Sequence, residues 1–186
     1  MTDRELLDRM REGDASAFDS IFRTWYASLV RLAEGLLREP MAAEEVVQDV
    51  LLELWRRRAV LVVEDSLRAY LFRSTRNRAL NHIRRRRVEQ RGEPQVLRIV
   101  QERTETADAA AGEAELAQAI DEAVRALPER CREVFQLSRA HGLRYTEIAT
   151  VLGISVKTVE AQMGKALRLL RERLAPWLGE RAAERE

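Results

Sequence analysis

The sequence contains few of the residues that build cofactor sites. Among its 186 residues there are two histidines and one cysteine, Cys131. A single cysteine cannot form an internal disulfide, so the fold does not depend on an oxidising compartment. The chain has neither a cysteine cluster for zinc nor a glycine-rich phosphate loop. We therefore expect no metal and no other cofactor, and we identify no catalytic residues.

Long apolar stretches are also missing. The best candidate, Ala59–Val63, is far shorter than the roughly 20 residues that a membrane-spanning helix needs. Residues Met1–Arg11 mix charged with apolar side chains and lack the apolar core of a signal peptide. We expect a cytoplasmic protein that makes no membrane contact of its own.

The pattern of apolar residues indicates helices, and proline and glycine are scarce, with 4 and 8 residues. Apolar residues recur at spacings of three and four over 17–37, which predicts an amphipathic helix. Pro40 suits the first turn of a second helix. A third helix is expected from Leu67 to about Arg87, after the candidate N-cap Ser66. On periodicity alone, Ala59–Val63 could form a strand.

A change in composition divides the chain. Residues 91–115 are acidic and rich in alanine, and glycine and proline interrupt them, which predicts a flexible linker. The expected fold is therefore all-α, with two small helical domains joined by a flexible acidic linker. We place the N-terminal domain at 1–90, the C-terminal domain at 116–178 and a tail at 179–186.

The C-terminal domain has the pattern of a helix-turn-helix. After a helix that Pro128 opens and Gly142 ends, Thr146 is expected to cap a short helix, Gly153 to make a turn and Ser155 to cap the last helix. A helix of this kind presents the residues of its first turns to base edges in the major groove. The alternative is a generic three-helix core with a solvated polar face.

The helix expected from Leu67 carries charge of one sign. It holds eight arginines up to Arg87 and no acidic residue. Arginines contact phosphates and stack, and aromatic rings are platforms for unpaired bases. Tyr70 and Phe72 lie about 200° apart on a helix, so we expect at most one to stack on a base and the other to lie in the core. For Arg84–Arg87, a solvated basic face is an equal alternative.

The preceding helix is acidic and apolar. Asp49 and Glu53 lie one turn apart, but the further ligands that a metal site needs are missing. With Trp55 nearby, a partner-docking face is favoured, because tryptophan is a common interface anchor. The alternative is that Trp55 belongs to the core.

Three segments, in this order, resemble bacterial RNA polymerase sigma factors of the extracytoplasmic-function group of the sigma-70 family. Met41–Trp55, "MAAEEVVQDVLLELW", is similar to their polymerase-binding helix, and Leu67–Arg87 to their promoter-melting helix. Leu127–Leu174 resembles their C-terminal helix-turn-helix domain. The resemblance implies a factor that binds core RNA polymerase and directs promoter-specific initiation. It implies no enzymatic activity and no small-molecule substrate, and it makes an anti-sigma protein a further candidate partner.

The resemblance also implies three surfaces. The polymerase-binding residues would be Asp49, Val50, Glu53, Leu54 and Trp55. The residues that contact the −10 element would be Tyr70, Arg73, Arg76, Asn77, Arg78, Asn81, Arg84 and Arg85. The residues that contact the −35 element would be Arg144, Tyr145, Thr146, Ser155, Val156, Lys157, Thr158, Glu160, Gln162, Lys165 and Arg168. A loop near Glu64 to Ser66 would hold a flipped base. Ser74 and Thr75 stand where the family more often has apolar residues.

Other functions remain open on the sequence alone. A stand-alone helix-turn-helix regulator would carry a sensor or dimerisation domain in its N-terminal half and prefer duplex to melted DNA. A nuclease would use Asp49 and Glu53 to bind magnesium and would cleave without a partner. A pure interaction protein would bind no DNA. The basic, aromatic-bearing helix and the acidic linker favour the sigma factor.

Overall fold

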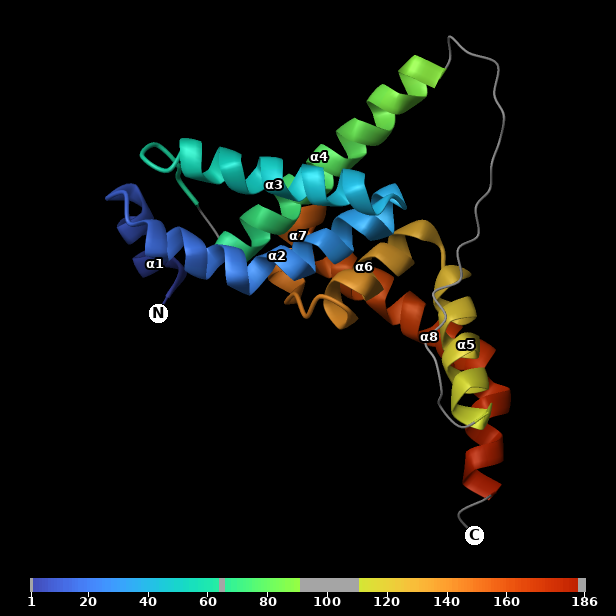
Figure 1. Ribbon diagram of the computed structural model, residues 1–186. Coiled ribbons are helices and arrows are strands. Elements are labelled where there is room, and N and C mark those ends of the chain that lie inside the picture. The colour runs from blue at the N-terminus through green and yellow to red at the C-terminus, as the bar shows by residue number, and fades with distance from the viewer. Residues whose placement is uncertain (1, 64–65, 91–110, 184–186) are drawn as a thin grey trace. The chain divides into compact units, whose positions relative to one another are not determined.

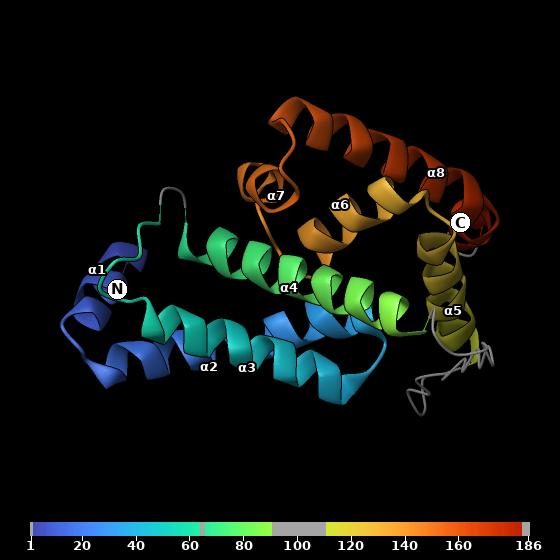
Figure 2. The same ribbon diagram turned by 90° about the horizontal axis from the view of Figure 1, so that it is seen from above.

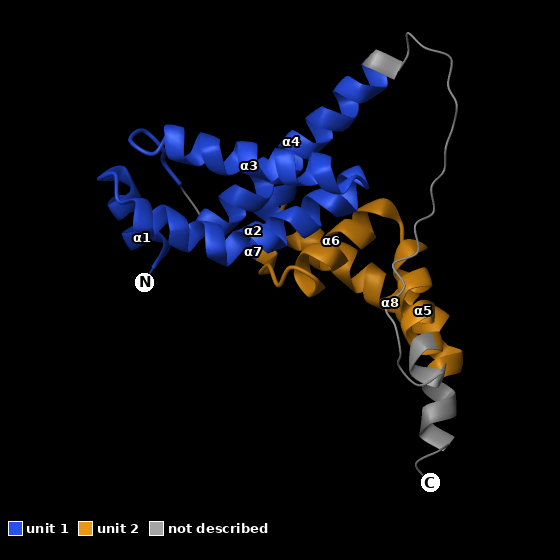
Figure 3. Cartoon of the chain, in the orientation of Figure 1, with its two compact units in different colours: residues 1–95, 146–154 blue, residues 96–145, 155–186 orange. Residues whose placement is uncertain are grey.

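The structure of the protein, a computed structural model, describes residues 2–63, 66–90 and 111–183. Within these ranges the chain forms eight α-helices and no strand, which confirms the all-α expectation. Two compact units can be distinguished (Figure 3): Met1–Gln95 with Thr146–Ile154, and Val96–Tyr145 with Ser155–Glu186.

The first helix, α1 (Asp3–Arg11), is not among those expected from the sequence. Thr2 and Glu5 form a reciprocal capping box at its start, in which each side chain accepts a hydrogen bond from the backbone N–H of the other residue. Leu7 and Met10 are buried. In so short a helix two buried positions give little periodicity, so the capping pattern was the usable signal.

Three longer helices pack pairwise on one another in the first unit (Figures 1 and 2). They are α2 (Ala15–Leu37), α3 (Pro40–Arg56) and α4 (Leu67–Gln90). Asp14 caps α2. Pro40 occupies the first turn of α3, where the fixed φ of proline matches that of a helix. Ser66 Oγ accepts a hydrogen bond from Ala69 N at 3.0 Å, which confirms the predicted cap of α4.

Ion pairs show how α3 and α4 run. Arg78 pairs with Asp49 at 3.3 Å, and Arg86, farther along α4, pairs with Glu39, which precedes α3. The partner with the higher residue number on α4 pairs with the one with the lower number at α3, so the two helices are antiparallel.

The connection between α3 and α4 contains no strand in its described part. Val60 and Val62 are 74% and 75% exposed, while Leu61 between them is buried. Val60 N and Leu61 N both donate to Arg57 O, at 3.0 and 2.9 Å, so the segment begins as a turn. The described residues include no other strand with which its backbone groups could pair, so the alternating burial does not produce a strand.

The second unit contains α5 (Ala111–Arg125), α6 (Glu129–Arg139) and α8 (Val156–Ala183). Both α5 and α6 pack against α8. A buried cluster joins the three helices and consists of Ala123, Leu127, Cys131, Ala166 and Leu170.

Several boundaries differ from the expectation. α5 begins at Ala111, inside the predicted linker 91–115, whose remaining residues 91–110 lie outside the described residues. α7 (Tyr145–Leu152) starts one residue before Thr146, so Thr146 lies inside the helix and does not cap it. α8 continues through Pro176 into the predicted tail 179–186. The domain limits 1–90 and 116–178 stay a prediction.

Candidate polymerase and nucleic-acid interfaces

Helix α4 divides its residues between the core and the surface. Its first half contributes Leu67, Leu71 and Phe72 to the core, and all three are fully buried. Phe72 is therefore the core member of the aromatic pair considered above, and the half-buried Tyr70 is the one left to meet a ligand. Sequence alone could not choose between the two, because both sides of a helix carry apolar residues here.

Five of the predicted −10-contacting residues form a continuous stripe on α4. Tyr70, Arg73, Asn77, Asn81 and Arg84 follow one another at spacings of three or four, which places them along one side of the helix. Tyr70 is half-buried and the other four are exposed. From Tyr70 to Arg84, a span of 15 residues, the stripe extends for about 21 Å. Asn81 Oδ1 accepts a hydrogen bond from Arg84 Nη1 at 3.3 Å, so two neighbours in the stripe are in contact.

Beyond the stripe, α4 ends in an exposed basic segment. All residues from Arg84 to Val88 are exposed, and this end of α4 projects away from α3 in Figure 1. Arg86 is the member paired with Glu39. Arg76, which is half-buried, and Arg78, which pairs with Asp49, complete the predicted set.

The predicted polymerase-binding residues do not lie on one face. Asp49 is exposed, but Val50 and Leu54 are only 4% and 0% exposed, because they point into the core with the rest of the apolar stripe of α3. Glu53 is half-buried and lies 3.8 Å from Arg57. Val50 and Leu54 thus support the surface from beneath.

Trp55 combines both alternatives drawn from the sequence. It is half-buried and its ring centroid lies 5.4 Å from that of Phe18 on α2. The Arg58 guanidinium lies over the indole, 4.3 Å from the ring centroid. Because both aromatic and cationic neighbours contact the ring, Trp55 is a packed edge residue.

The outward face of α3 contains apolar residues that are not among the predicted polymerase-binding residues. Met41 is 83% exposed and Leu52 is 47% exposed. With Glu45 and Gln48, which are also exposed, they follow helical spacing along the same side of α3. Exposed large apolar side chains between charged ones are typical of an interface. Their position opposite the buried valines was the available signal.

The structure brings one polymerase-binding candidate and one DNA-binding candidate together. The Arg78 guanidinium lies 3.3 Å from Asp49, and both side chains are about half exposed. An exposed pair of this kind stabilises a protein by at most about 1 kcal/mol. The two predicted surfaces therefore adjoin at this ion pair.

Helices α7 and α8 follow one another through a tight turn. Gly153 has a φ of +66°, in the left-handed region that glycine favours. Ser155 Oγ accepts from Thr158 N at 3.1 Å, which confirms the predicted cap of α8. Val159 is fully buried one turn into α8, while Val156 and Lys157 are exposed.

The remaining −35 candidates differ in exposure. Exposed members are Arg144, Tyr145, Thr146, Ser155, Thr158, Glu160, Lys165 and Arg168. Ser155 Oγ and Thr158 Oγ1 lie 2.8 Å apart and bond each other. Gln162 is half-buried, and its Oε1 accepts a hydrogen bond from the Cys131 thiol at 3.1 Å. Its carboxamide oxygen is therefore directed toward α6.

Among the residues that the structure describes, no group of three or more histidine, cysteine, aspartate or glutamate side chains could hold a metal ion. No helix in the described ranges is both long and apolar enough to cross a membrane.

Comparison with known proteins places both halves of the chain. Residues 21–89 match the family described as Sigma-70 region 2, and residues 117–170 match Sigma-70, region 4. The chain is 26% identical over 171 residues to the ECF RNA polymerase sigma factor SigK of Mycobacterium tuberculosis, covering 89% of this chain and 90% of SigK. SigM of the same organism is 28% identical over 178 residues, covering 96% and 85%.

Solved structures share the fold. A chain in the structure of CnrH in complex with the cytosolic domain of CnrY matches with a TM-score of 0.65 and 26% identity, over 94% of this chain and 97% of that one. The structure of the sigma factor RpoE with the anti-sigma factor NepR from Bartonella quintana matches in fold, with a TM-score of 0.60 and 23% identity, over 85% and 96%.

A region 2 followed by a region 4 defines a promoter-specificity factor of bacterial RNA polymerase. The chain belongs to the sigma-70 family of such factors, in its extracytoplasmic-function group. It binds core RNA polymerase and directs promoter-specific transcription initiation through −10 and −35 DNA.

Proposed function

We propose that this sigma factor binds its partners through three separate surfaces. The outward face of α3 docks on core polymerase, the stripe on α4 contacts the −10 element, and the first turns of α8 contact the −35 element. The factor works in the cytoplasm, catalyses no reaction itself and takes no small-molecule substrate. The observation that carries this proposal is the division of α4, where Phe72 fills the core while Arg73, Asn77 and Asn81 stay exposed.

The α4 stripe suits DNA that is opening. Two asparagines lie between two arginines along it, so it offers charge for phosphates and amides for base edges. Tyr70 at its start can stack on an unpaired base. The basic residues Arg84, Arg85 and Arg87 extend the same charge toward the flanking phosphates.

The α8 surface suits duplex DNA. Val159 and Met163 anchor the helix while Lys157 and Glu160 stay exposed in its first turns. A helix enters the major groove with this end forward. Lys165 and Arg168, farther along, are exposed and can reach phosphates.

An anti-sigma protein is the proposed regulatory partner. The similar structures include RpoE bound to an anti-sigma factor and CnrH bound to a cytosolic domain of CnrY. Since the factor would be inactive while its docking face is covered, such a partner would compete with core polymerase.

Core binding tests the docking face directly. Purified core polymerase is titrated with the wild type and with Asp49→Arg and Leu52→Ala variants, and the dissociation constants are compared. We expect Asp49→Arg to weaken binding by roughly tenfold or more, because it puts a larger side chain of opposite charge in place of an exposed carboxylate on the docking face, and Leu52→Ala to weaken it less.

The control for this titration is Arg78→Ala. This variant also breaks the ion pair with Asp49 but leaves the face of α3 intact. Its affinity for core should match the wild type. Equal weakening by Asp49→Arg and Arg78→Ala would locate the effect in the ion pair and remove the argument for the docking face.

A further inference from the structure

Helix α1 holds the chain on both sides of the connection between α3 and α4. Arg11 Nη2 donates to Leu61 O at 2.8 Å, and Asp3 Oδ2 accepts from Leu67 N at 2.9 Å. Leu61 follows α3, and Leu67 is the first residue of α4. The N-terminal helix therefore contacts the backbone where the DNA-contacting helix begins.

Asp3 is a second capping group for α4. The first N–H groups of a helix have no partner within it. Ser66 accepts from Ala69 N, and Asp3 takes the N–H of Leu67. A carboxylate at this end also interacts favourably with the helix dipole. Asp3 therefore favours one placement of the first turn of α4, which leads directly into Tyr70.

Arg11 is held in position by its own helix. Its Nη1 donates to Asp8 Oδ1 at 2.7 Å, three residues earlier on α1. Leu7 and Met10 of α1 are buried, so the helix that carries both contacts is fixed to the core. The Arg11 guanidinium thus contacts Leu61 O from a helix that is fixed to the core.

Apolar packing does not replace these two contacts. A partly open pocket of about 360 Å³ lies between them, with Leu7, Val63 and Leu67 among its lining residues. Side chains do not fill this pocket, although Leu7 and Leu67 beside it are buried. The two hydrogen bonds therefore add to the apolar packing in fixing the distance between α1 and the start of α4.

We propose that Asp3 and Arg11 are positioning residues for −10 recognition. By fixing the start of α4 they keep Tyr70 and Arg73 in register with the −10 element. This inference rests on the proposed role of the α4 stripe, and it assigns a promoter-related role to a helix that precedes the matched residues 21–89.

The test uses the full chain assembled with core polymerase. A promoter is first recovered from genomic DNA by in vitro transcription with the wild-type holoenzyme. Open-complex yields are then measured on that promoter and on a copy with a substituted −10 element, and their ratio gives the selectivity. Asp3→Ala and Arg11→Met remove the two contacts, while Asp3→Asn keeps an oxygen that can accept from Leu67 N.

We expect Asp3→Ala and Arg11→Met each to lower the selectivity ratio by roughly three- to tenfold, the size of effect typical of a lost helix cap for Asp3 and of a lost hydrogen bond from a charged group for Arg11. Asp3→Asn should stay within about twofold of the wild type. Arg9→Ala is the matched control on the same helix. Arg9 contacts Asp14 and Ser16, so this substitution should lower the stability of the protein without touching the start of α4.

Two results would overturn the positioning role. One is an equal loss of selectivity in Arg9→Ala, which would mean that α1 acts through overall stability alone. The other is unchanged selectivity in Asp3→Ala while Asn81→Ala still impairs opening. If Asn81→Ala also had no effect, the assignment of the α4 stripe would fail, and the positioning role with it.

Discussion

At the scale of the residue, Thr75 is a polar side chain buried in an apolar environment. It lies on α4 between Leu71 and Ala79, and its side chain is fully buried. Its Oγ1 atom has no hydrogen-bond partner among the described residues. Burying a hydroxyl group without a partner costs about 1–3 kcal/mol. The resemblance had already indicated that Thr75 stands where apolar residues are more common.

Replacing Thr75 by valine should stabilise the protein. Valine keeps the shape and removes the unpaired hydroxyl, so Thr75→Val should raise the free energy of unfolding by about 1 kcal/mol in urea denaturation. The control is Thr24→Val, because Thr24 Oγ1 is exposed and donates to Ser20 O at 2.7 Å. That variant should gain nothing. No gain in Thr75→Val would show that its hydroxyl is satisfied in solution.

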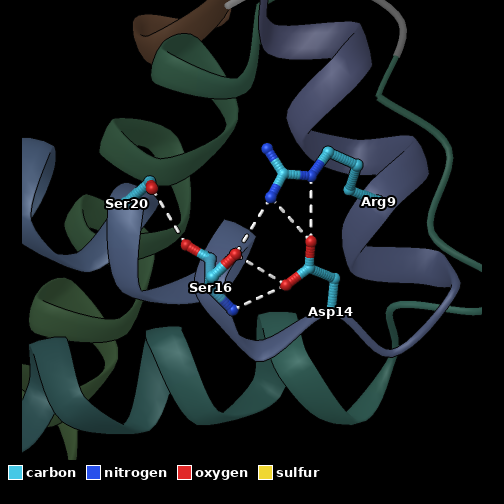
Figure 4. Close-up of polar contacts among 4 residues, drawn as sticks. All are labelled: Arg9, Asp14, Ser16 and Ser20. Atoms are coloured by element: carbon cyan, nitrogen blue, oxygen red, sulfur yellow. Dashed lines mark hydrogen bonds and ion pairs between the residues drawn. The ribbon is translucent and has the colours of Figure 1, made fainter.

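At the scale of the element, the junction of α1 and α2 is a polar network (Figure 4). Asp14 Oδ1 accepts from the backbone N and Oγ of Ser16 at 2.8 and 2.7 Å, and Asp14 Oδ2 accepts from Arg9 Nε at 2.9 Å. The hydrogen bonds from Ser16, with those from Arg9, lower the pKa of Asp14 from its usual 3.8 to about 2. The carboxylate therefore caps α2 and holds α1 against it.

This network predicts a dependence of stability on pH. Because folding lowers the pKa of Asp14, its contribution is fully present above pH 3.8 and is lost as the pH falls through about 2. Asp14→Asn retains a capping oxygen but carries no charge. The wild type should have the higher melting temperature at pH 7, and the difference should shrink between pH 4 and pH 2. A constant difference across that range would contradict the assignment.

At the scale of the whole molecule, charge is unevenly distributed although the formal net charge is only +1. α4 carries eight arginines against Glu89, and the exposed basic residues of α8 include Lys157 and Arg168. Phosphate contacts make DNA binding depend on salt, while base contacts set sequence preference. Substitutions in α4 and in α8 should therefore have different effects on the salt dependence and on the opening of a promoter complex.

Asn81→Ala and Lys157→Ala should separate these two effects in holoenzyme. Lys157→Ala should weaken binding to upstream duplex DNA and reduce the slope of log affinity against log salt by about 1, because one phosphate contact is lost. Asn81→Ala should lower open-complex yield, followed by permanganate reactivity, with the slope unchanged. Identical effects of both variants on slope and opening would argue against separate duplex and −10 surfaces.

Local patterns in the sequence determined much of this protein. The helices around α2, α3 and α4, the caps Ser66 and Ser155, and the turn at Gly153 follow from spacing and capping chemistry, which act within a few residues. The order of three family-like segments was likewise sufficient to predict a sigma factor.

Tertiary packing decided what local patterns leave open. Whether Tyr70 or Phe72 enters the core depends on which side of α4 meets the other helices, and Phe72 is the buried one. The same choice buries Val50 and Leu54 and exposes Leu52. Partners such as Arg78 with Asp49, or Asp3 with Leu67 N, are far apart in sequence. Periodicity identifies a helix and the faces that carry apolar residues, but only the neighbouring helices determine which of these faces is buried.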